Sequence, residues 1–399
     1  MKSAKSCILT INGGSSSIKF ALFEIAAAPA QLYKGELERI GTKNAALHFT
    51  ETNTGQKRSV NINISNQDDA ANFLVTWLEK QDWFASVGAI GHRIVHGMGH
   101  VQPERVTPDL LGELKKISSY DPEHLPLEIK LIECFRERYP GMAQIACFDT
   151  SFHAFMPQVA RLLPIPRRFY AMGIRRYGFH GLSYSYLLEE FGRMTGNKAA
   201  QGRLILAHLG NGASLAAVKD GKSMDTSMGF TPASGLPMGT RSGDLDPGVT
   251  GYLMETEKLS LQQFNHLIHH ESGLLGLSET SSDMQDLLKS MDTDTRAAEA
   301  VELFCYQTKK WIGSFSAVLG GLDNLVFSGG IGENAPEIRA RICRGLQFLG
   351  IELDQTRNLK NETIISTDSG KTTVRVIHTN EELMIARLVS ADLKHPIKN

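Results

Sequence analysis

The stretch ILTINGGSSSI, residues 8–18, decides the fold, because a similar stretch, ILAHLGNGASL, returns at residues 205–215. Each stretch begins with Ile-Leu, places a glycine at the same spacing and ends with Ser before an aliphatic residue. Apolar runs on both sides of a glycine turn predict two strands joined by that turn. The two copies lie about half the chain apart. The pattern therefore predicts a related hairpin in each half, although two unrelated hairpins would look alike.

The bulk composition limits the class of protein. A chain of 399 residues is long enough for two domains. The net charge of −1 argues against a nucleic-acid or membrane partner, since both favour a strong basic excess. No apolar stretch approaches the length of a membrane span. The 5 cysteines are scattered and odd in number, so we expect reduced thiols and a cytoplasmic protein.

Alternating strand and helix patterns predict an α/β protein. We expect strands at 7–11, 18–23 and 144–148, and helices at 68–80, 107–117 and 296–319. The Ser/Gly stretch at 328–332 is expected to form a turn after a strand, with Pro336 in the first turn of the next helix.

Side chains at two helix starts fit the capping patterns. Asp68 is expected to cap the helix at 68–80. Thr379 and Glu382 fit a capping box for a C-terminal helix, which makes Glu382 structural in this interpretation.

Cations and carboxylates adjoin several glycine turns. Arg93 lies between glycines, Asp149 ends an apolar strand, and His180 and Arg241 each follow a tight turn. Phosphoryl transfer requires such groups, because the transferred group spreads negative charge over three oxygens. The structural alternatives stay open: a salt-bridged Arg93, a turn or cap at Asp149, and a core histidine at His180.

Nine strings, taken in order, carry a resemblance to a known family: NGGSSSIKF, GHRIVHG, CFDTSFH, RRYGFHG, HLGNGAS, DGKSMDTSMGFTP, GTRSGDLDPG, SGGIGENAPEIR and TNEELMIAR. They resemble the acetate kinases and, more broadly, the short-chain carboxylate kinases that include propionate and butyrate kinases. The resemblance runs from about residue 7 to residue 388. It implies a homodimer that uses ATP and Mg²⁺, with Mn²⁺ as an alternative ion, to make an acyl phosphate and ADP reversibly.

The resemblance also implies an α/β fold of two actin-like (ribonuclease H-like) lobes with mixed sheets. We expect the first lobe at 1–150, joined by a C-terminal helix at about 382–399, and the second, nucleotide-binding lobe at 151–381. Closure of such lobes is expected to exclude water from the reaction.

Roles for individual residues follow from the resemblance. Asp149, His180, Arg241 and Arg93 correspond to catalytic residues. A carboxylic acid with a pKa near ~4.3 is already ionised at neutral pH. We therefore expect Asp149 to hold Mg²⁺ or its water and to orient Arg93, not to act as a base.

Ligand-binding residues are implied in the same way. Asn12 and Glu381 correspond to the metal site, and Arg93, Val95, Phe179 and Pro232 to the site of the carboxylate and its acyl tail. The nucleotide-binding positions are Lys19, His208, Leu209, Gly210, Asn211, Gly212, Asp283, Met284, Gln285, Gly330, Ile331, Gly332, Glu333 and Asn334.

The chain departs from the family pattern at three places. Met284-Gln285 stand where Phe-Arg is usual, which removes a cation from the nucleotide site. Glu123 replaces an apolar residue and Leu125 an asparagine. Leu182 and Tyr184 stand where Thr and His are usual.

The sequence favours an ATP-dependent kinase of acetate that acts by direct in-line transfer. Propionate or butyrate with the same mechanism is the first alternative. A sugar or polyol kinase on the same fold, or a non-catalytic actin-like ATPase, is the second.

Overall fold

The computed structural model describes residues 6–394 except 15–16, 27, 63 and 65. The chain divides into two compact units, Met1–Ser151 with Asn380–Asn399, and Phe152–Thr379. Ser15 and Ser16 of the first glycine turn, and the expected helical residues 395–399, lie outside the described residues. Among the described residues, no helix combines the length and the apolar character needed to cross a membrane.

The first unit is built on a mixed sheet of eight strands among its described residues, in the order β5-β4-β3-β2-β1-β6-β8-β7. β1 pairs antiparallel with β2 and parallel with β6, which itself runs parallel to β8. The strands are β1 Cys7–Gly13, β2 Ile18–Glu24, β3 Gln31–Glu38, β4 Ala46–Glu51, β5 Lys57–Asn61, β6 Val87–Ile94, β7 Glu104–Arg105 and β8 Ala143–Phe148.

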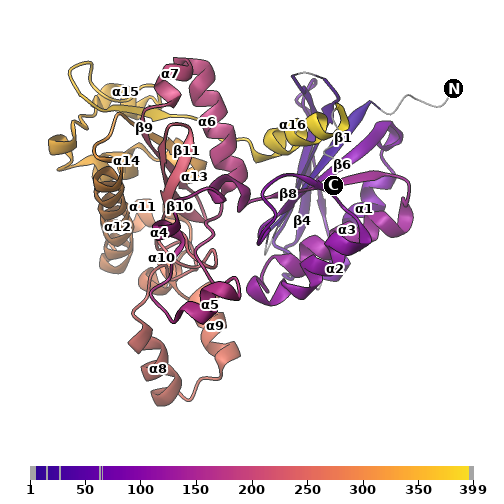
Figure 1. The fold of residues 1–399 in the computed structure, drawn as a ribbon, viewed down its shortest axis with the longest axis horizontal. Helices are drawn as coiled ribbons and strands as arrows, with labels where there is room; N and C mark the ends of the chain where they lie inside the picture. Colours follow the sequence, from indigo (N-terminus) through magenta and orange to yellow (C-terminus); the bar gives the residue numbers. More distant parts are fainter. Residues whose placement is uncertain (1–5, 15–16, 27, 63, 65, 395–399) are drawn as a thin grey trace. The chain divides into compact units, whose positions relative to one another are not determined.

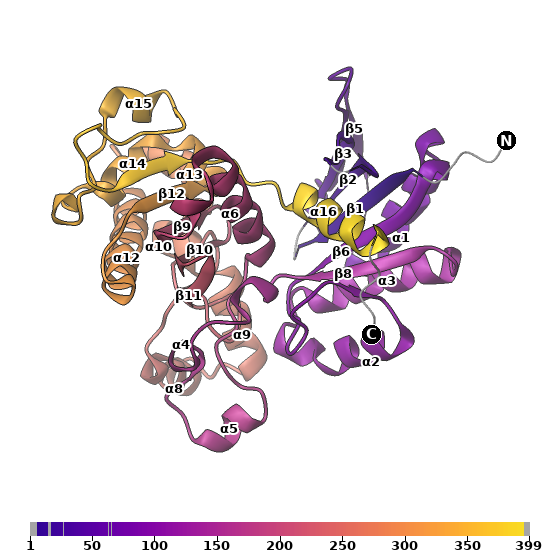
Figure 2. The same ribbon diagram turned by 45° about the horizontal axis from the view of Figure 1, so that its top comes forward.

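Helices cover both faces of this sheet (Figures 1 and 2). α1 and α3 pack on one face, where their apolar side chains form a core with Leu9 and Ile11 of β1. α16 packs on the other face, so closely that a methyl group on Gly91 would lie 2.4 Å from Ile385. The helices are α1 Gln67–Glu79, α2 Pro108–Lys116, α3 Leu125–Arg138 and α16 Glu381–Lys394.

The second unit contains a five-stranded mixed sheet, counted over its described residues, in the order β11-β10-β9-β12-β13. β9 and β10 form an antiparallel hairpin, and β12 runs parallel to both β9 and β13. The strands are β9 Arg203–Leu209, β10 Ala213–Lys219, β11 Lys222–Thr226, β12 Asn324–Ser328 and β13 Thr373–Val376.

Two helices pack against this second sheet from opposite sides, α6 and α12 (Figure 1). Leu187 and Phe191 of α6 form a core with Leu204 and Leu206 of β9. Gly320 ends α12 in the left-handed conformation that suits glycine, as expected for a helix stopped by a glycine pair. The helices are α4 Gln158–Arg161, α5 Arg167–Ala171, α6 Gly181–Thr195, α7 Asn197–Ala200, α8 Pro247–Thr256, α9 Leu261–His270, α10 Gly273–Ser278, α11 Met284–Ser290, α12 Thr295–Leu319, α13 Gly329–Asn334, α14 Pro336–Cys343 and α15 Gln355–Leu359.

Three local predictions are wrong. Asn66, not Asp68, caps α1, because its side chain accepts the backbone N–H of Asp69 at 2.8 Å. Asn380, not Thr379, caps α16, because its side chain accepts the N–H of Leu383 at 2.9 Å. The stretch that we expected to be a turn at 328–332 is mostly the short helix α13.

Candidate active site

A buried ion pair marks the ends of two parallel strands in the first unit. Arg93 near the end of β6 donates through Nε and Nη2 to one carboxylate oxygen of Asp149, at 3.0 and 2.7 Å. The side chain of Asp149 is 0% exposed and that of Arg93 11%. Burial lowers the pKa of Arg93, but the attraction of Asp149 outweighs it and the net shift is upward. The guanidinium is therefore a permanent, oriented cation.

Asn12 links this cation to two carboxylates at the start of α16. Its Nδ2 donates to Oε2 of Glu381 at 2.9 Å and to Oε1 of Glu382 at 3.2 Å, while its Oδ1 accepts from Arg93 at 3.4 Å. Burial, and then the neighbouring Glu381, raise the pKa of Glu382. The prediction that Glu382 belongs to a capping box is wrong, because its side chain instead accepts from Asn12.

The donor set around Asn12 fits Mg²⁺. Mg²⁺ prefers oxygen ligands and usually takes one or two carboxylates while keeping several waters. An amide oxygen and two adjacent carboxylates, one with a pKa raised by burial, supply such ligands and would gain from a divalent charge. In the described part of the chain, no group of three or more His, Cys, Asp or Glu side chains is arranged as a metal site.

Lys19 lies directly opposite Asn12 in the β1–β2 ladder. Burial lowers the pKa of Lys19, but nearby carboxylates, Glu36 first among them, outweigh it and the net shift is upward. Lys19 and Glu382 line a cavity of about 340 Å³ in the first unit. The ammonium is thus balanced by local carboxylates.

A further buried acid adjoins the expected acyl-binding residue Val95. Glu128 of α3 accepts the backbone N–H of Val95 with both oxygens, at 3.2 and 3.0 Å. Burial is the main cause that raises the pKa of Glu128 well above its ordinary value. The sequence analysis did not identify Glu128. The signal that could have found it is an acidic residue among the apolar, buried positions of the helix at 125–138.

His180 lies at the N-terminus of α6 in the second unit. Its φ of 59° is in the left-handed region, which is costly for a residue with a side chain and typical of functional sites. Its Nδ1 lies 2.8 Å from the hydroxyl of Ser214. The preceding Phe179 is 1% exposed, and its carbonyl accepts from Nε2 of the buried His153 at 3.1 Å. The orientation of the His180 ring is therefore fixed by its contact with Ser214 and by the position of the preceding residue.

Arg241 belongs to a loop held by the start of α10. The carbonyls of Met238 and Gly239 accept from the N–H groups of Leu274 and Leu275, at 2.8 and 2.9 Å. The guanidinium Nη1 donates to the carbonyl of Pro232 at 3.0 Å. These contacts fix the position of the guanidinium beside the loop.

His180 and Arg241 converge on one glycine. A methyl group on Gly212 would lie 3.2 Å from Nε2 of His180 and 3.9 Å from Nη1 of Arg241. Gly212 ends the turn between β9 and β10. A glycine turn flanked by an imidazole and a guanidinium is suited to an anionic group with spread charge.

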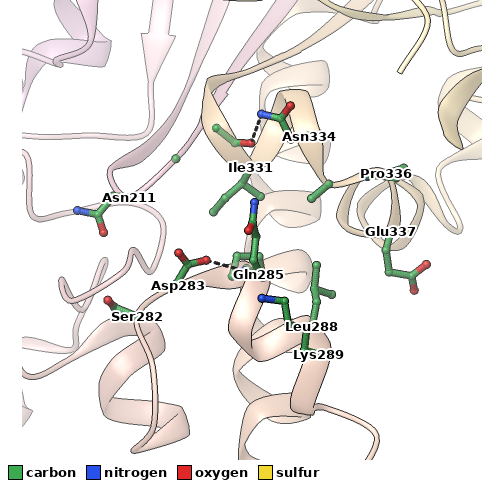
Figure 3. Close-up of a pocket in the computed structure, with 14 residues that line it drawn as sticks. Asn211, Ser282, Asp283, Gln285, Leu288, Lys289, Ile331, Asn334, Pro336 and Glu337 are labelled. Carbon is green, nitrogen blue, oxygen red and sulfur yellow. Dashed lines mark hydrogen bonds between the residues drawn. The ribbon is translucent and has the colours of Figure 1, made fainter. Parts of the chain in front are cut away.

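A cavity of about 580 Å³ adjoins the same turn (Figure 3). In Figure 3 the side chain of Gln285 points from α11 toward Ile331 of α13, and the carboxylate of Asp283 accepts the N–H of Gln285 at 2.7 Å. The lining residues are Gly210, Asn211, Ser282, Asp283, Met284, Gln285, Leu288, Lys289, Gly330, Ile331, Asn334, Ala335, Pro336 and Glu337. Its apolar and amide-bearing walls suit a nucleoside.

The structure thus brings together eight of the predicted nucleotide-binding residues: Gly210, Asn211, Asp283, Met284, Gln285, Gly330, Ile331 and Asn334. Glu333 of α13, also predicted to bind the nucleotide, is not among the residues that line the cavity. Its carboxylate accepts the backbone N–H groups of Gly329 and Thr379, at 2.9 and 3.0 Å, and also contacts His378. Glu333 therefore ties α13 to the segment after β13.

Three further predicted nucleotide-binding residues lie close in sequence to residues that line the cavity but have other neighbours. His208 stacks on His180, with ring centroids 4.3 Å apart. Leu209 is buried and pairs with Ala213 across the hairpin, and Gly332 packs near β9.

The sequence reasoning missed several residues that line the cavity, including Leu288, Lys289 and Glu337. Lys289 follows Gln285 by four residues on α11, so the helical spacing alone places both on one face. That spacing is the signal that would have found Lys289.

Most departures from the family pattern are buried, whereas Gln285 is exposed. Leu125 begins α3 and is 0% exposed, and the neighbouring His124 pairs with Asp121 at 2.9 Å. Leu182 and Tyr184 are buried in the first turn of α6. Glu123 is partly exposed.

Comparison with known proteins shows the family of this chain. The profile of the Acetokinase family matches residues 7–387. The acetate kinase of Rhodopseudomonas palustris (strain TIE-1) is 42% identical over 388 residues, covering 96% of this chain and 97% of the relative. The propionate kinase of Citrobacter rodentium (strain ICC168) is 42% identical over 386 residues, covering 95% of each chain.

The fold is similar to solved structures as well. A propionate kinase from Francisella tularensis subsp. tularensis SCHU S4 has a TM-score of 0.89 and 36% identity, covering 96% of this chain and 98% of that one. The predicted fold class, α/β with mixed sheets in two actin-like lobes, is confirmed.

Proposed function

The chain belongs to the Acetokinase family, and from that premise we propose that it transfers the γ-phosphoryl group of ATP to acetate, giving acetyl phosphate and ADP reversibly. Kinases of this family use ATP and Mg²⁺. The carboxylate oxygen attacks the γ-phosphorus in line. As the new P–O bond forms, the bond to the β,γ-bridging oxygen breaks and ADP leaves with that electron pair.

The convergence of His180 Nε2 and Arg241 Nη1 on Gly212 is the single observation that carries this proposal. Negative charge grows on the oxygens of the transferring group, and donors fixed in advance stabilise it without reorganisation. Gly210 and Asn211 of the same turn line the proposed nucleotide cavity. The turn is therefore suited to the phosphoryl end of a bound nucleotide.

Arg93 is proposed to bind the carboxylate. A planar guanidinium matches a carboxylate by two parallel hydrogen bonds, which an ammonium cannot do. Asp149 holds Arg93 by Nε and Nη2, which supports an orienting role. The substrate is an anion at neutral pH, so the step requires no general base.

Asn12 and Glu381, with Glu382 beside them, would hold Mg²⁺. When bound, this ion neutralises phosphate charge and orients the phosphate oxygens. Asn12 also contacts Arg93 through Oδ1, which supports a common arrangement of the metal-binding and carboxylate-binding groups in the first unit.

A hydroxamate assay tests the proposal. The full chain is incubated with ATP, Mg²⁺, hydroxylamine and acetate, propionate or butyrate, and trapped acyl phosphate is read as coloured hydroxamate. We expect product with all three acids and the highest kcat/KM with acetate. Preferred phosphorylation of glucose or glycerol, or ATP hydrolysis indifferent to every acid, would contradict it.

Propionate is the second candidate substrate, because an acetate kinase and a propionate kinase match this chain at the same identity of 42%. An apolar pocket separates neighbouring chain lengths by only about 1–3 kcal/mol per methylene. The ratio of kcat/KM for the two acids therefore decides between them. Val95, Phe179 and Pro232 are the proposed acyl-binding residues.

We also propose a cytoplasmic homodimer. All five cysteines are free and buried, which suits a reducing compartment. Light scattering coupled to gel filtration measures the mass directly; a mass near the 43.9 kDa of a single chain at micromolar concentration would contradict the dimer.

A further inference from the structure

Two stacked imidazoles in the second unit are anchored in the same way. Nδ1 of His180 lies 2.8 Å from the hydroxyl of Ser214, and Nδ1 of His208 lies 2.8 Å from the hydroxyl of Ser183. A methyl group on Gly212 would lie 3.2 Å from Nε2 of His180, and one on Gly210 would lie 3.9 Å from Nε2 of His208. Both rings therefore turn Nε2 toward the glycine turn between β9 and β10.

A tyrosine stands behind the serine that anchors His180. The hydroxyl of Tyr184 lies 2.5 Å from that of Ser214, and both residues are 0% exposed. Tyr184 follows His180 by one turn of α6, while Ser214 belongs to β10. The three side chains thus form a hydrogen-bonded series, Tyr184–Ser214–His180, that starts on α6 and ends at its N-cap residue.

We propose that Tyr184 is a positioning residue for the phosphoryl transfer, acting through Ser214 to hold Nε2 of His180 as a hydrogen-bond donor toward the transferring group; the inference rests on the proposed function. A neutral imidazole carries its hydrogen on one nitrogen only. When Tyr184 donates to Ser214, the single hydrogen of the serine hydroxyl is given to Nδ1. Nε2 then keeps the ring hydrogen.

The opposite direction gives a ring that is unsuited to the site. If Nδ1 donated to Ser214, and Ser214 to Tyr184, Nε2 of the neutral ring would present a lone pair to the phosphoryl oxygens. A lone pair repels an anion, whereas an N–H stabilises it.

The tyrosine hydroxyl is not required to fill space, since phenylalanine has nearly the same volume. A buried hydroxyl is retained where it has a hydrogen-bonded role, because burying it without a partner is unfavourable. The left-handed backbone of His180 makes the ring direction dependent on such outside contacts. Tyr184, a departure from the family pattern, thereby acquires a function in this chain.

The test is the substitution Tyr184→Phe in the full chain. We expect kcat to fall about 10-fold, the value of one hydrogen bond, with the KM of ATP and of acetate changed less than about two-fold. The matched control is Tyr186→Phe, which removes a hydroxyl from a half-buried tyrosine of the same helix and should leave kcat unchanged.

Nitrogen-15 NMR of labelled histidine reads the tautomer of His180 independently of activity. The wild-type spectrum should show a protonated Nε2 and an unprotonated Nδ1, and Tyr184→Phe should shift it toward a mixture of tautomers. A wild-type ring with its hydrogen on Nδ1 would overturn the proposal. So would a Tyr184→Phe variant with an unchanged spectrum and full kcat.

A double-substitution cycle separates positioning from a merely structural role. In a His180→Gln background, Tyr184→Phe should cause no further loss of kcat, because its effect passes through the imidazole. An equal loss in both backgrounds would refute the proposal. If Tyr184→Phe does not fold, as judged by its thermal unfolding, Ser214→Ala carries the same test with the same expected loss.

Failure of the proposed function gives a different result. A wild-type chain that forms no hydroxamate with any acid contradicts the kinase proposal, while the NMR result still decides whether Tyr184 and Ser214 set the tautomer of His180.

Discussion

The β1–β2 hairpin of the first unit and the β9–β10 hairpin of the second have the same backbone plan but hold their polar side chains differently. Both are antiparallel strands joined at a glycine-bearing turn. Beside the first hairpin, charged side chains are held by ionic contacts: Arg93 forms an ion pair with Asp149, and Asn12 donates a hydrogen bond to the carboxylate of Glu381. Beside the second, neutral hydroxyl groups hold imidazoles.

This difference predicts how strongly each unit is affected by the substitution of a polar side chain. Removing one member of a buried ion pair leaves an uncompensated charge and costs about 3–5 kcal/mol. Removing one neutral hydrogen bond costs about 0.5–1.5 kcal/mol. We therefore expect large effects from substitutions in the first unit and smaller, graded effects in the second.

The largest effect is expected from Asp149→Asn. The substitution removes the carboxylate that holds Arg93 by Nε and Nη2, so kcat/KM for acetate should fall about 1,000-fold, as for loss of an oriented cation. Initial rates at saturating Mg²⁺ measure it. The control is Asp392→Asn, which breaks the ion pair between the buried Asp392 and the exposed Arg105 in the same unit and should lower stability without this loss of rate. Full activity of Asp149→Asn would show that charge pairing is not what organises the first unit.

Acid should destabilise both units, because each contains a histidine whose pKa is lowered by burial. Burial lowers the pKa of His92 and of His153 to about 4. Between pH ~6.5 and ~4 the unfolded chain binds protons that the folded chain does not, so stability falls as pH falls, by up to about 3 kcal/mol for each histidine. Urea unfolding at pH 7 and pH 4.5 measures this loss.

Substituting each histidine in turn shows how much of the pH dependence of stability comes from each unit. His92→Gln and His153→Gln should each reduce the pH dependence by about one proton, or about 1.4 kcal/mol per pH unit. A wild-type stability that stays flat from pH 7 to pH 4.5 would contradict the assignment for both units.

Gly212→Ala should disturb the second unit without changing any charge. The added methyl group would lie 3.2 Å from Nε2 of His180, so the ring must move. The ring needs to move by only a few tenths of an ångström. Because a displacement near 1 Å at a catalytic group costs about 100-fold in rate, we expect kcat to fall by about 10-fold. The control is Gly313→Ala in α12, where a methyl group meets open space and should raise helix stability by up to about 1 kcal/mol. Unchanged kcat in Gly212→Ala would separate the turn from the reaction.

The smallest effect is expected in the nucleotide cavity. Gln285→Arg adds a cation to its wall and should lower the KM of ADP by about five-fold, since a partly exposed ion pair contributes about 1 kcal/mol. Gln262→Arg, on the exposed face of α9, is the matched control. A KM that stays constant or rises would place the ADP phosphates away from Gln285.

Local predictions succeeded where the pattern was long and failed at its ends. The strands of both hairpins and the helix at 107–117, capped by Thr107, agree with the periodicity of their apolar residues. Near the start of each of the helices α1 and α16, two residues were suitable as N-caps. Which of them caps the helix, Asn66 in α1 and Asn380 in α16, depends on backbone conformation, which residue type does not reveal.

The amino-acid sequence by itself determined the α/β class, the two hairpins and the family, because these follow from residue periodicity and from motifs in a fixed order. Tertiary structure decided which partners those residues meet. Nothing local in the chain links Asn12 to Glu381, Glu128 to Val95 or Tyr184 to Ser214. Each pair joins segments that only sheet and helix packing bring together, and burial then sets the charges and hydrogen bonds on which the proposed chemistry depends.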